Sequence, residues 1–178
     1  MQNFLIVVDM QNDFIDGALG SAEAVKIVEN VKKRIEYAFS IGEIVIFTRD
    51  THTNDYLTTQ EGVKLPVKHC IFGTEGWQIC NQLKPFASKS MIIDKPTFGS
   101  VKLAEIIKNA NDIEPIGKVT LLGLCTDICV ISNAMLIKNT LPEIAVCVDA
   151  SCSAGVTVDS HLNALSAMKM CQIEIENE

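Results

Sequence analysis

The amino-acid sequence predicts an α/β fold: a three-layer α/β/α sandwich built on an open, mainly parallel, Rossmann-like sheet of five to six strands. Short, continuously apolar segments recur along the chain, and such segments are typical of strands buried on both faces. Amphipathic segments with helical spacing lie between them. An alternation of strands and helices implies right-handed crossovers and a sheet covered on both faces.

Five segments are predicted as strands, and a short sixth is expected near the C-terminus. The five are continuously apolar rather than alternating, so we expect them to be buried on both faces. They are FLIVVD (4–9), EIVIFT (43–48), SMIID (90–94), KVTLLGL (118–124) and EIAVCVD (143–149), followed by QIEI (172–175).

Four segments are predicted as helices, and three of them begin at a residue whose side chain can cap a helix. In the first, residues 21–39, apolar residues recur at helical spacing with charges opposite, and Gly42 follows as a stop signal. The other three begin at Ser100, at Thr126 or Asp127, and at Thr157.

Length, charge and cysteine content exclude several classes of protein. The 178 residues suit one compact domain and no linker composition divides them, so residues 1–178 are predicted to form a single domain.

A net charge of −7 without a Lys/Arg-rich stripe argues against nucleic acid and membranes as partners. No apolar run approaches the roughly 20 residues needed to cross a bilayer, and the N-terminus lacks the basic region of a signal peptide. The seven cysteines are scattered, which favours reduced thiols and a cytoplasmic location.

Groups able to do chemistry follow four of the predicted strands. Ligands of open α/β sheets bind outside the carboxyl ends of the strands. Asp9 ends the first strand, Asp50 and His52 follow the second, Lys95 follows the third, and Cys129 follows the fourth. An acid, a cation, a thiol and two groups able to bind metal are therefore expected at one edge of the sheet.

The segment GLCTDICV (123–130) places Cys129 in the first turn of its helix. Free backbone N–H groups, the helix dipole and a nearby Lys95 would favour a thiolate there. The alternative is that Cys129 is a small buried hydrophobic residue. Cys125 lies in the turn before the helix, and the pair lacks the spacing of a zinc clip.

Asp9 and Lys95 each have a structural alternative to catalysis. A carboxylate at the end of a buried strand is expected to form an ion pair or to take part in catalysis, because desolvation of the charge is costly and raises the pKa of the group. Asp9 could therefore cap a helix or form a buried ion pair with Lys95. Lys95 considered alone could be a solvated loop lysine.

A second group of polar residues surrounds the long connection 51–89. Asp50 and His52 are two residues apart, so they face the same side of an extended segment, and Glu61 and His69 follow. Carboxylate and imidazole ligands suit zinc, manganese or iron. The alternative is that each is an ordinary polar loop residue. The remaining histidine, His161, is predicted to be a surface or structural residue, and the remaining cysteines are predicted to fill space in the structure: Cys70, Cys80, Cys147, Cys152 and Cys171.

The motifs VVDMQNDF, TRDTH, PVKHCIFGTEGW and GLCTDICV, with a lone lysine after the third strand, resemble the isochorismatase-like cysteine hydrolase superfamily. Within it, the chain is most similar to nicotinamidases and pyrazinamidases. The resemblance covers nearly the whole chain in the right order.

This resemblance implies a metal-dependent amidohydrolase that converts nicotinamide to nicotinate and ammonia, a step of NAD salvage and pyridine nucleotide biosynthesis, through a cysteine thioester. Asp9, Lys95 and Cys129 match the catalytic triad. Backbone N–H groups of Cys125 and Cys129 would meet the oxyanion, with a cis peptide bond at Leu124–Cys125.

The resemblance also implies a divalent metal ion, zinc first and manganese or iron as alternatives. It assigns Asp50, His52 and His69 as ligands, with Glu61 where other members have a further histidine or glutamate. Phe14 matches a ring-stacking phenylalanine, and Leu65 lies near the position of a further aromatic residue. The partner is a small-molecule amide, and members often self-associate, so a homo-oligomer is compatible with the resemblance.

Two alternative functions stay open at this point. One is another isochorismatase-like hydrolase that acts on a carbamoyl or ureido amide or on an isochorismate-type substrate, generally without the metal ligands. The other is a non-catalytic doubly wound binding module, against which neither GxGxxG after the first strand nor GxxxxGK[ST] occurs.

Overall fold

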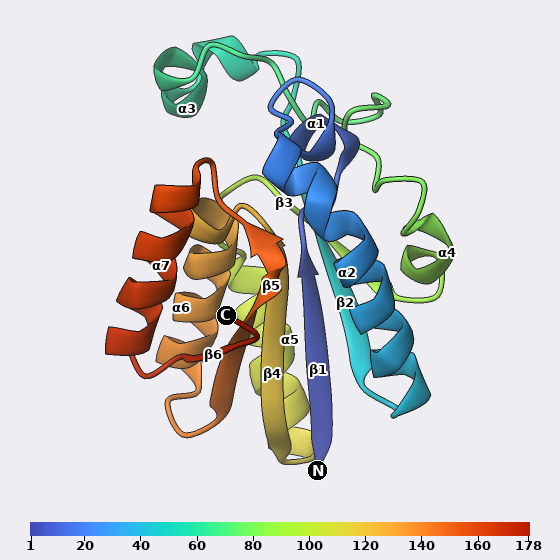
Figure 1. Ribbon diagram of the computed structural model, residues 1–178, viewed down its shortest axis with the longest axis vertical. Helices are drawn as coiled ribbons and strands as arrows, with labels where there is room; N and C mark the ends of the chain where they lie inside the picture. The colour runs from blue at the N-terminus through green and yellow to red at the C-terminus, as the bar shows by residue number, and fades with distance from the viewer.

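The computed structural model describes residues 1–178 and confirms the predicted α/β class. Six parallel strands form one sheet in the order β3-β2-β1-β4-β5-β6, with helices on both faces (Figure 1). The strands are β1 Gln2–Val8, β2 Ile44–Asp50, β3 Met91–Lys95, β4 Ile116–Leu124, β5 Ala145–Ala154 and β6 Glu174–Glu176.

The central strand β1 explains why the apolar segments do not alternate. Successive side chains of a strand point to opposite faces of the sheet. Leu5 and Val7 enter the core on the α2 side, whereas Phe4 and Ile6 enter the core on the side of α5, α6 and α7. All are buried, so both faces of the strand must be apolar.

Four long helices cover the sheet close to their predicted positions. They are α2 Ala22–Ser40, α5 Val101–Ile113, α6 Ile131–Thr140 and α7 Val158–Met170. Ser21, Ser100 and Thr157 each cap a helix by accepting a hydrogen bond from a backbone N–H in its first turn. None of these helices has the length and apolar character needed to span a bilayer.

The predicted cap at Thr126 or Asp127 is wrong. A π-helical turn, Thr126–Val130, precedes α6, and Cys125 is the residue before it, without a side-chain cap. Thr126 and Asp127 cannot cap because their side chains bind the neighbouring β5–α7 region, through His161 and the backbone N–H of Val156.

The prediction that β3 is buried on both faces is also wrong. This strand lies at the edge of the sheet, where Met91 and Ile92 are exposed and only Ile93 and Lys95 are buried. Apolar composition does not reveal the place of a strand within a sheet, and an edge strand has a paired neighbour on one side only.

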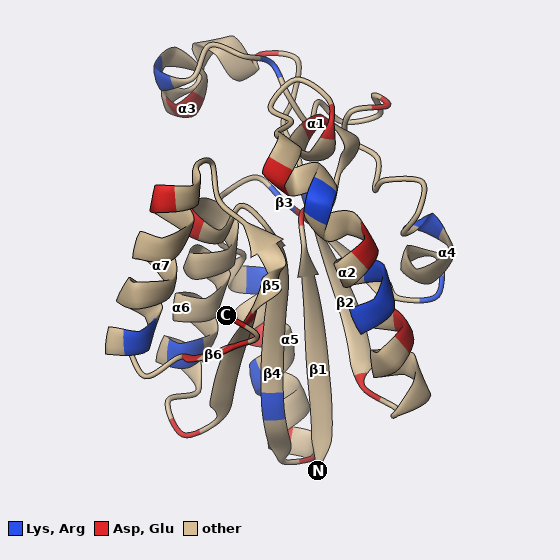
Figure 2. Cartoon of the chain, viewed as in Figure 1, with Lys and Arg blue, Asp and Glu red and all other residues tan.

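Most of the irregular segments gather beyond the carboxyl ends of the strands. The short helix α1, Asn12–Ile15, follows β1, and the connection after β2 contains a 3₁₀ turn, Tyr56–Thr58, and the short helix α3, Gln60–Lys64. A further short helix of this connection, α4, Lys84–Ala87, lies instead beside α2 (Figure 1). Figure 1 shows α1 and α3 above the strand ends. Charged residues are scattered over the helices and loops without a stripe of one sign (Figure 2).

Replacing Ile6 by alanine is expected to lower the free energy of unfolding by about 2–5 kcal/mol, because the cavity left between β1 and the helices on that face of the sheet cannot close fully. Ile6 is completely buried, whereas Ile113 at the end of α5 is 88% exposed. Ile113→Ala should change stability by less than about 0.5 kcal/mol. Urea denaturation of both variants measures the difference, and equal losses would contradict the described core.

Candidate active site

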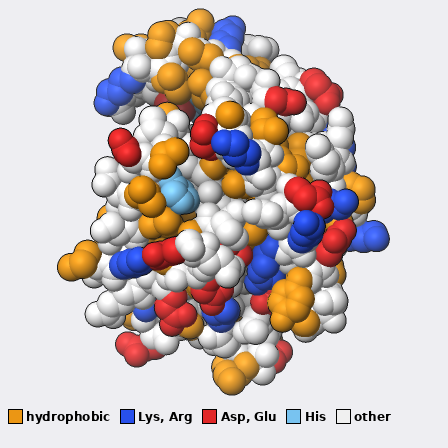
Figure 3. Space-filling view, in the orientation of Figure 1, with side chains coloured by type: hydrophobic (Ala, Val, Ile, Leu, Met, Phe, Trp, Pro, Cys, Tyr) orange, Lys and Arg blue, Asp and Glu red, His pale blue; other side chains and the backbone are white.

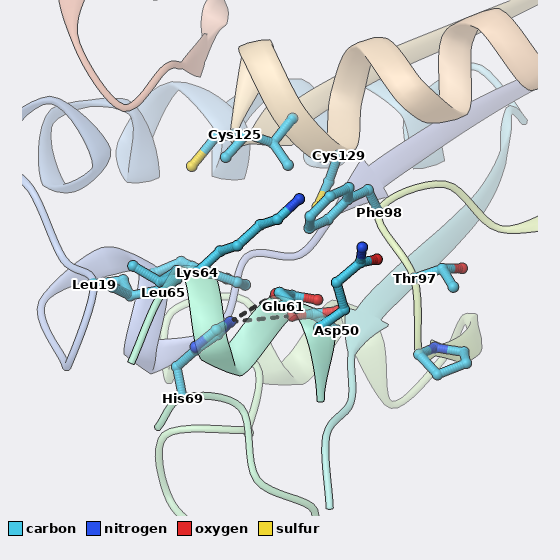
Figure 4. Close-up of a pocket in the computed structure, with 14 residues that line it drawn as sticks. Leu19, Asp50, Glu61, Lys64, Leu65, His69, Thr97, Phe98, Cys125 and Cys129 are labelled. Carbon is cyan, nitrogen blue, oxygen red and sulfur yellow. Dashed lines mark ion pairs between the residues drawn. The ribbon is translucent and has the colours of Figure 1, made fainter. Parts of the chain in front are cut away.

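A cavity of about 380 Å³ lies beyond the carboxyl ends of the strands (Figure 4). Cys125 and Cys129 lie on one wall, and Asp50, Glu61 and His69 lie on the opposite wall. The cavity therefore brings the predicted thiol and the predicted metal ligands to one place.

The ammonium group of Lys95 joins these two walls. Its Nζ lies 2.7 Å from Asp9 Oδ2, 3.4 Å from Cys129 Sγ and 3.4 Å from Asp50 Oδ1. It also donates a hydrogen bond of 3.1 Å to the carbonyl oxygen of Thr97. Lys95 is 1% exposed, so the alternative of a solvated loop lysine is wrong.

Asp9 is held in one position at the end of β1 by its surroundings. It follows β1 with φ of 49°, in the left-handed region that aspartate enters more readily than most residues. Thr48 Oγ1 donates a hydrogen bond of 2.6 Å to Asp9 Oδ1. Burial raises the pKa of Asp9, although the nearby Lys95 charge lowers it. A raised pKa makes Asp9 a stronger base than an ordinary carboxylate.

The surroundings of Cys129 favour a neutral thiol over the expected thiolate. Burial and the negative charge of Asp9 raise the pKa of the Cys129 thiol well above its ordinary value, and the attraction of Lys95 does not offset them. Cys129 therefore rests as a neutral thiol. Its use as a nucleophile requires a base in contact, and Asp9 is that neighbour.

Two side chains of the segment after β1 hold the cavity wall that contains Asp50 and His69. Sequence reasoning missed this function. The Gln11 side chain accepts a hydrogen bond of 2.7 Å from the backbone N–H of Asp50 and donates to the carbonyl oxygens of Asp50 and Trp77, at 2.8 and 2.9 Å. Asp13 Oδ2 accepts a hydrogen bond of 2.7 Å from the backbone N–H of Cys70, beside His69. Both side chains thus hold backbone next to predicted metal ligands.

The predicted metal ligands converge. His52 Nε2 lies 3.0 Å from Asp50 Oδ2, and His69 Nε2 lies 3.6 Å from the same oxygen. Glu61 Oε1 lies 3.6 Å from His52 Nε2 and 3.8 Å from His69 Nε2. Burial would raise the pKa of Asp50, but His52, His69 and Lys95 hold that pKa well below its usual range, so its oxygens are charged acceptors.

These residues fit a divalent ion such as zinc. His52 Nε2 is buried and makes no hydrogen bond. His69 Nδ1 lies 2.8 Å from the carbonyl oxygen of Val67, and donation there leaves Nε2 free to coordinate. Two imidazole nitrogens with carboxylate oxygens are a usual zinc donor set.

Aromatic side chains surround the two imidazoles. Tyr56 packs against both, with ring centroids 4.7 Å from His52 and 5.0 Å from His69, and its hydroxyl donates to the carbonyl oxygen of Leu65. Phe14 lies 5.5 Å from the His69 ring. Tyr56 was missed by sequence reasoning because no motif marks it.

The predicted substrate-binding residues Phe14, Leu65 and Cys125 all line the cavity. Phe98 lines it as well, and sequence reasoning missed this residue because it lies in an irregular loop. The peptide bond Leu124–Cys125 is cis, as expected.

The other predicted structural residues lie outside this site, apart from Cys70 beside His69. Cys70, Cys80, Cys147 and Cys152 are buried, whereas Cys171 is exposed and is not a core residue. No cysteine is in a disulfide.

Comparisons with known proteins agree with this arrangement. The isochorismatase domain family matches residues 3–177. The nicotinamidase/pyrazinamidase of Mycobacterium tuberculosis (strain ATCC 25618 / H37Rv) is 27% identical over 187 residues, covering 96% of each chain.

Solved structures are similar over the whole chain. Nicotinamidase/pyrazinamidase from Bacillus subtilis has a TM-score of 0.85 at 25% identity, covering 99% of this chain and 100% of that chain. Pyrazinamidase of Pyrococcus horikoshii in complex with zinc has a TM-score of 0.82 at 25% identity, covering 100% of both.

The four converging side chains predict tight zinc binding. Protein loaded with zinc and dialysed should retain about one ion per chain, measured by elemental analysis. His69→Ala should weaken zinc binding by at least about 100-fold, more than the loss of a supporting residue costs. Glu75→Gln is a matched control, because this side chain of the same connection is 77% exposed. If Glu61→Gln binds zinc as Glu75→Gln does, Glu61 is not a ligand.

Proposed function

Because the chain belongs to the isochorismatase family, we propose that it is a metal-dependent nicotinamidase. It converts nicotinamide to nicotinate and ammonia through a thioester on Cys129. One observation carries this proposal: the Lys95 ammonium contacts Asp9, Cys129 and Asp50, so the proposed nucleophile lies next to the proposed metal ligands. The similar pyrazinamidase of Pyrococcus horikoshii was solved in complex with zinc, which supports the proposal of a metal-dependent enzyme.

Asp50, His52, His69 and Glu61 would hold the metal ion. When bound, the ion offers a Lewis-acid position for the pyridine nitrogen of the substrate. The ring then lies in the apolar part of the cavity, which Phe14, Leu65 and Phe98 line. Such walls orient a flat aromatic amide and exclude water from the reacting carbon.

The first half of the reaction forms the thioester. Asp9 takes the proton of the neutral Cys129 thiol, and the sulfur attacks the carboxamide carbon. The backbone N–H groups of Cys125 and Cys129 are the proposed donors to the oxyanion, and removal of one such donor typically costs about 10²–10³ in rate. Protonated Asp9 then gives its proton to the leaving nitrogen, and ammonia departs.

The second half releases the acid. Asp9, again a carboxylate, takes a proton from water as the water oxygen attacks the thioester carbon. The carbon–sulfur bond breaks, and the proton returns to the sulfur. Lys95 keeps its positive charge throughout, and this charge stabilises the anionic states of both Asp9 and Cys129.

Cys129→Ala should lower ammonia release from nicotinamide by at least about 10⁴-fold, because Cys129 is the thiol that lies against the Lys95 ammonium. Cys171→Ala, at an exposed thiol, should keep the rate of the unchanged protein. Steady-state ammonia release over a panel of aryl and ureido amides measures both. Full activity of Cys129→Ala excludes the mechanism, and turnover of ureido amides alone would assign the chain to another branch of the family.

A further inference from the structure

The turn that carries Cys129 is bound from outside the active site by α7. Thr126 is the first residue of the π-helical turn, its side chain is fully buried, and its Oγ1 lies 2.8 Å from Nδ1 of His161. His161 is half-buried and lines two surface hollows beside α7. Figure 3 shows histidine atoms at the surface over this part of the molecule.

The available hydrogen-bond partners determine which atom donates in this contact. Thr126 Oγ1 makes no other hydrogen bond, and a buried hydroxyl proton without an acceptor is costly. The hydroxyl therefore donates, and Nδ1 of His161 accepts, which requires a neutral imidazole. A protonated imidazole can only donate from Nδ1, so the contact in this form is lost when His161 gains a proton.

A second contact also attaches the Cys129 turn to the region of α7. The carboxylate of Asp127 accepts hydrogen bonds of 3.1 and 3.3 Å from the backbone N–H of Val156, in the loop between β5 and α7. The loop lies close to α7 itself, because a Cβ atom added at Gly155 would be 2.8 Å from the backbone nitrogen of His161. The start of α7 and the Cys129 turn are therefore packed as one unit.

We infer that His161 is a positioning residue for the nucleophile: its neutral imidazole holds Thr126 and keeps Cys129 in line with Asp9. The inference rests on the proposed function for its catalytic consequence. It names a residue that never touches the substrate, since His161 does not line the catalytic cavity.

The charges around His161 set the direction of its pH dependence. Partial burial lowers the pKa of His161 below the ordinary 6.5, although Asp127 on the turn opposes this shift. Glu23 and Lys26 of α2 line one hollow with it, and Lys169 and Glu178 line the other. Because the folded-state pKa is lowered, the contact is intact at neutral pH and is lost as the pH falls through that pKa.

The experiment compares His161→Asn, which keeps an acceptor near the place of Nδ1 but cannot titrate, with His161→Leu, which removes the acceptor. At neutral pH, His161→Leu should lower kcat for nicotinamide about tenfold with KM nearly unchanged. His161→Asn should keep kcat within about threefold and should stay active at acidic pH where the unchanged protein loses activity. Ser166→Ala, on the same helix and outside the catalytic cavity, is the control and should match the unchanged protein.

Hydrogen–deuterium exchange of the segment 124–131 tests the attachment without activity. The exchange rates are first corrected for their intrinsic pH dependence. At neutral pH, exchange should be faster in His161→Leu than in His161→Asn. At acidic pH, exchange should be faster in the unchanged protein than in His161→Asn. If no variant hydrolyses nicotinamide, the proposed function fails, and the exchange rates still decide the attachment. The inference would be overturned if all variants had the same pH profile and the same exchange rates. It would also be overturned if His161→Asn lost as much kcat as His161→Leu at neutral pH.

Discussion

The site depends on one buried cation, the ammonium group of Lys95 at the end of β3. An unpaired ammonium would be very costly at 1% exposure, and burial by itself would lower its pKa. The negative charges of Asp9 and Asp50 instead raise the pKa of Lys95, so the cation persists. Three parallel strands make this possible, because β1, β2 and β3 are neighbours and their carboxyl ends deliver Asp9, Asp50 and Lys95 to one point.

The same ammonium couples the two chemical parts of the site. Asp50 lies with one oxygen near Lys95 and with the other near His52 and His69, so this one carboxylate links the proposed triad to the proposed metal ligands. Gln11 holds the backbone of Asp50 from the segment that begins with Asp9. In the proposed mechanism the thiol stays neutral until Asp9 removes its proton, so the acid–base work falls on a carboxylate whose pKa burial has raised.

Much of this could be predicted from the sequence, because apolar segments fix the strands and parallel strands end at one edge of the sheet. That rule is enough to expect Asp9, Lys95 and Cys129 near one another. The functions of Gln11 and Asp13 could not be predicted, because their partners lie 39 and 57 residues away along the chain. The raised pKa of Cys129 was missed for a related reason: full burial and the charge of Asp9 depend on the folded structure, whereas the sequence shows only a helix start and a lysine.

The most direct measurement of the central claim is acid quenching during turnover of nicotinamide, followed by mass spectrometry of the peptides. The account predicts a nicotinoyl group on the peptide that contains Cys129, bound at Sγ of that residue and absent when substrate is omitted. An unmodified Cys129 under conditions of measured turnover, or an acyl group on Cys125 instead, would contradict it.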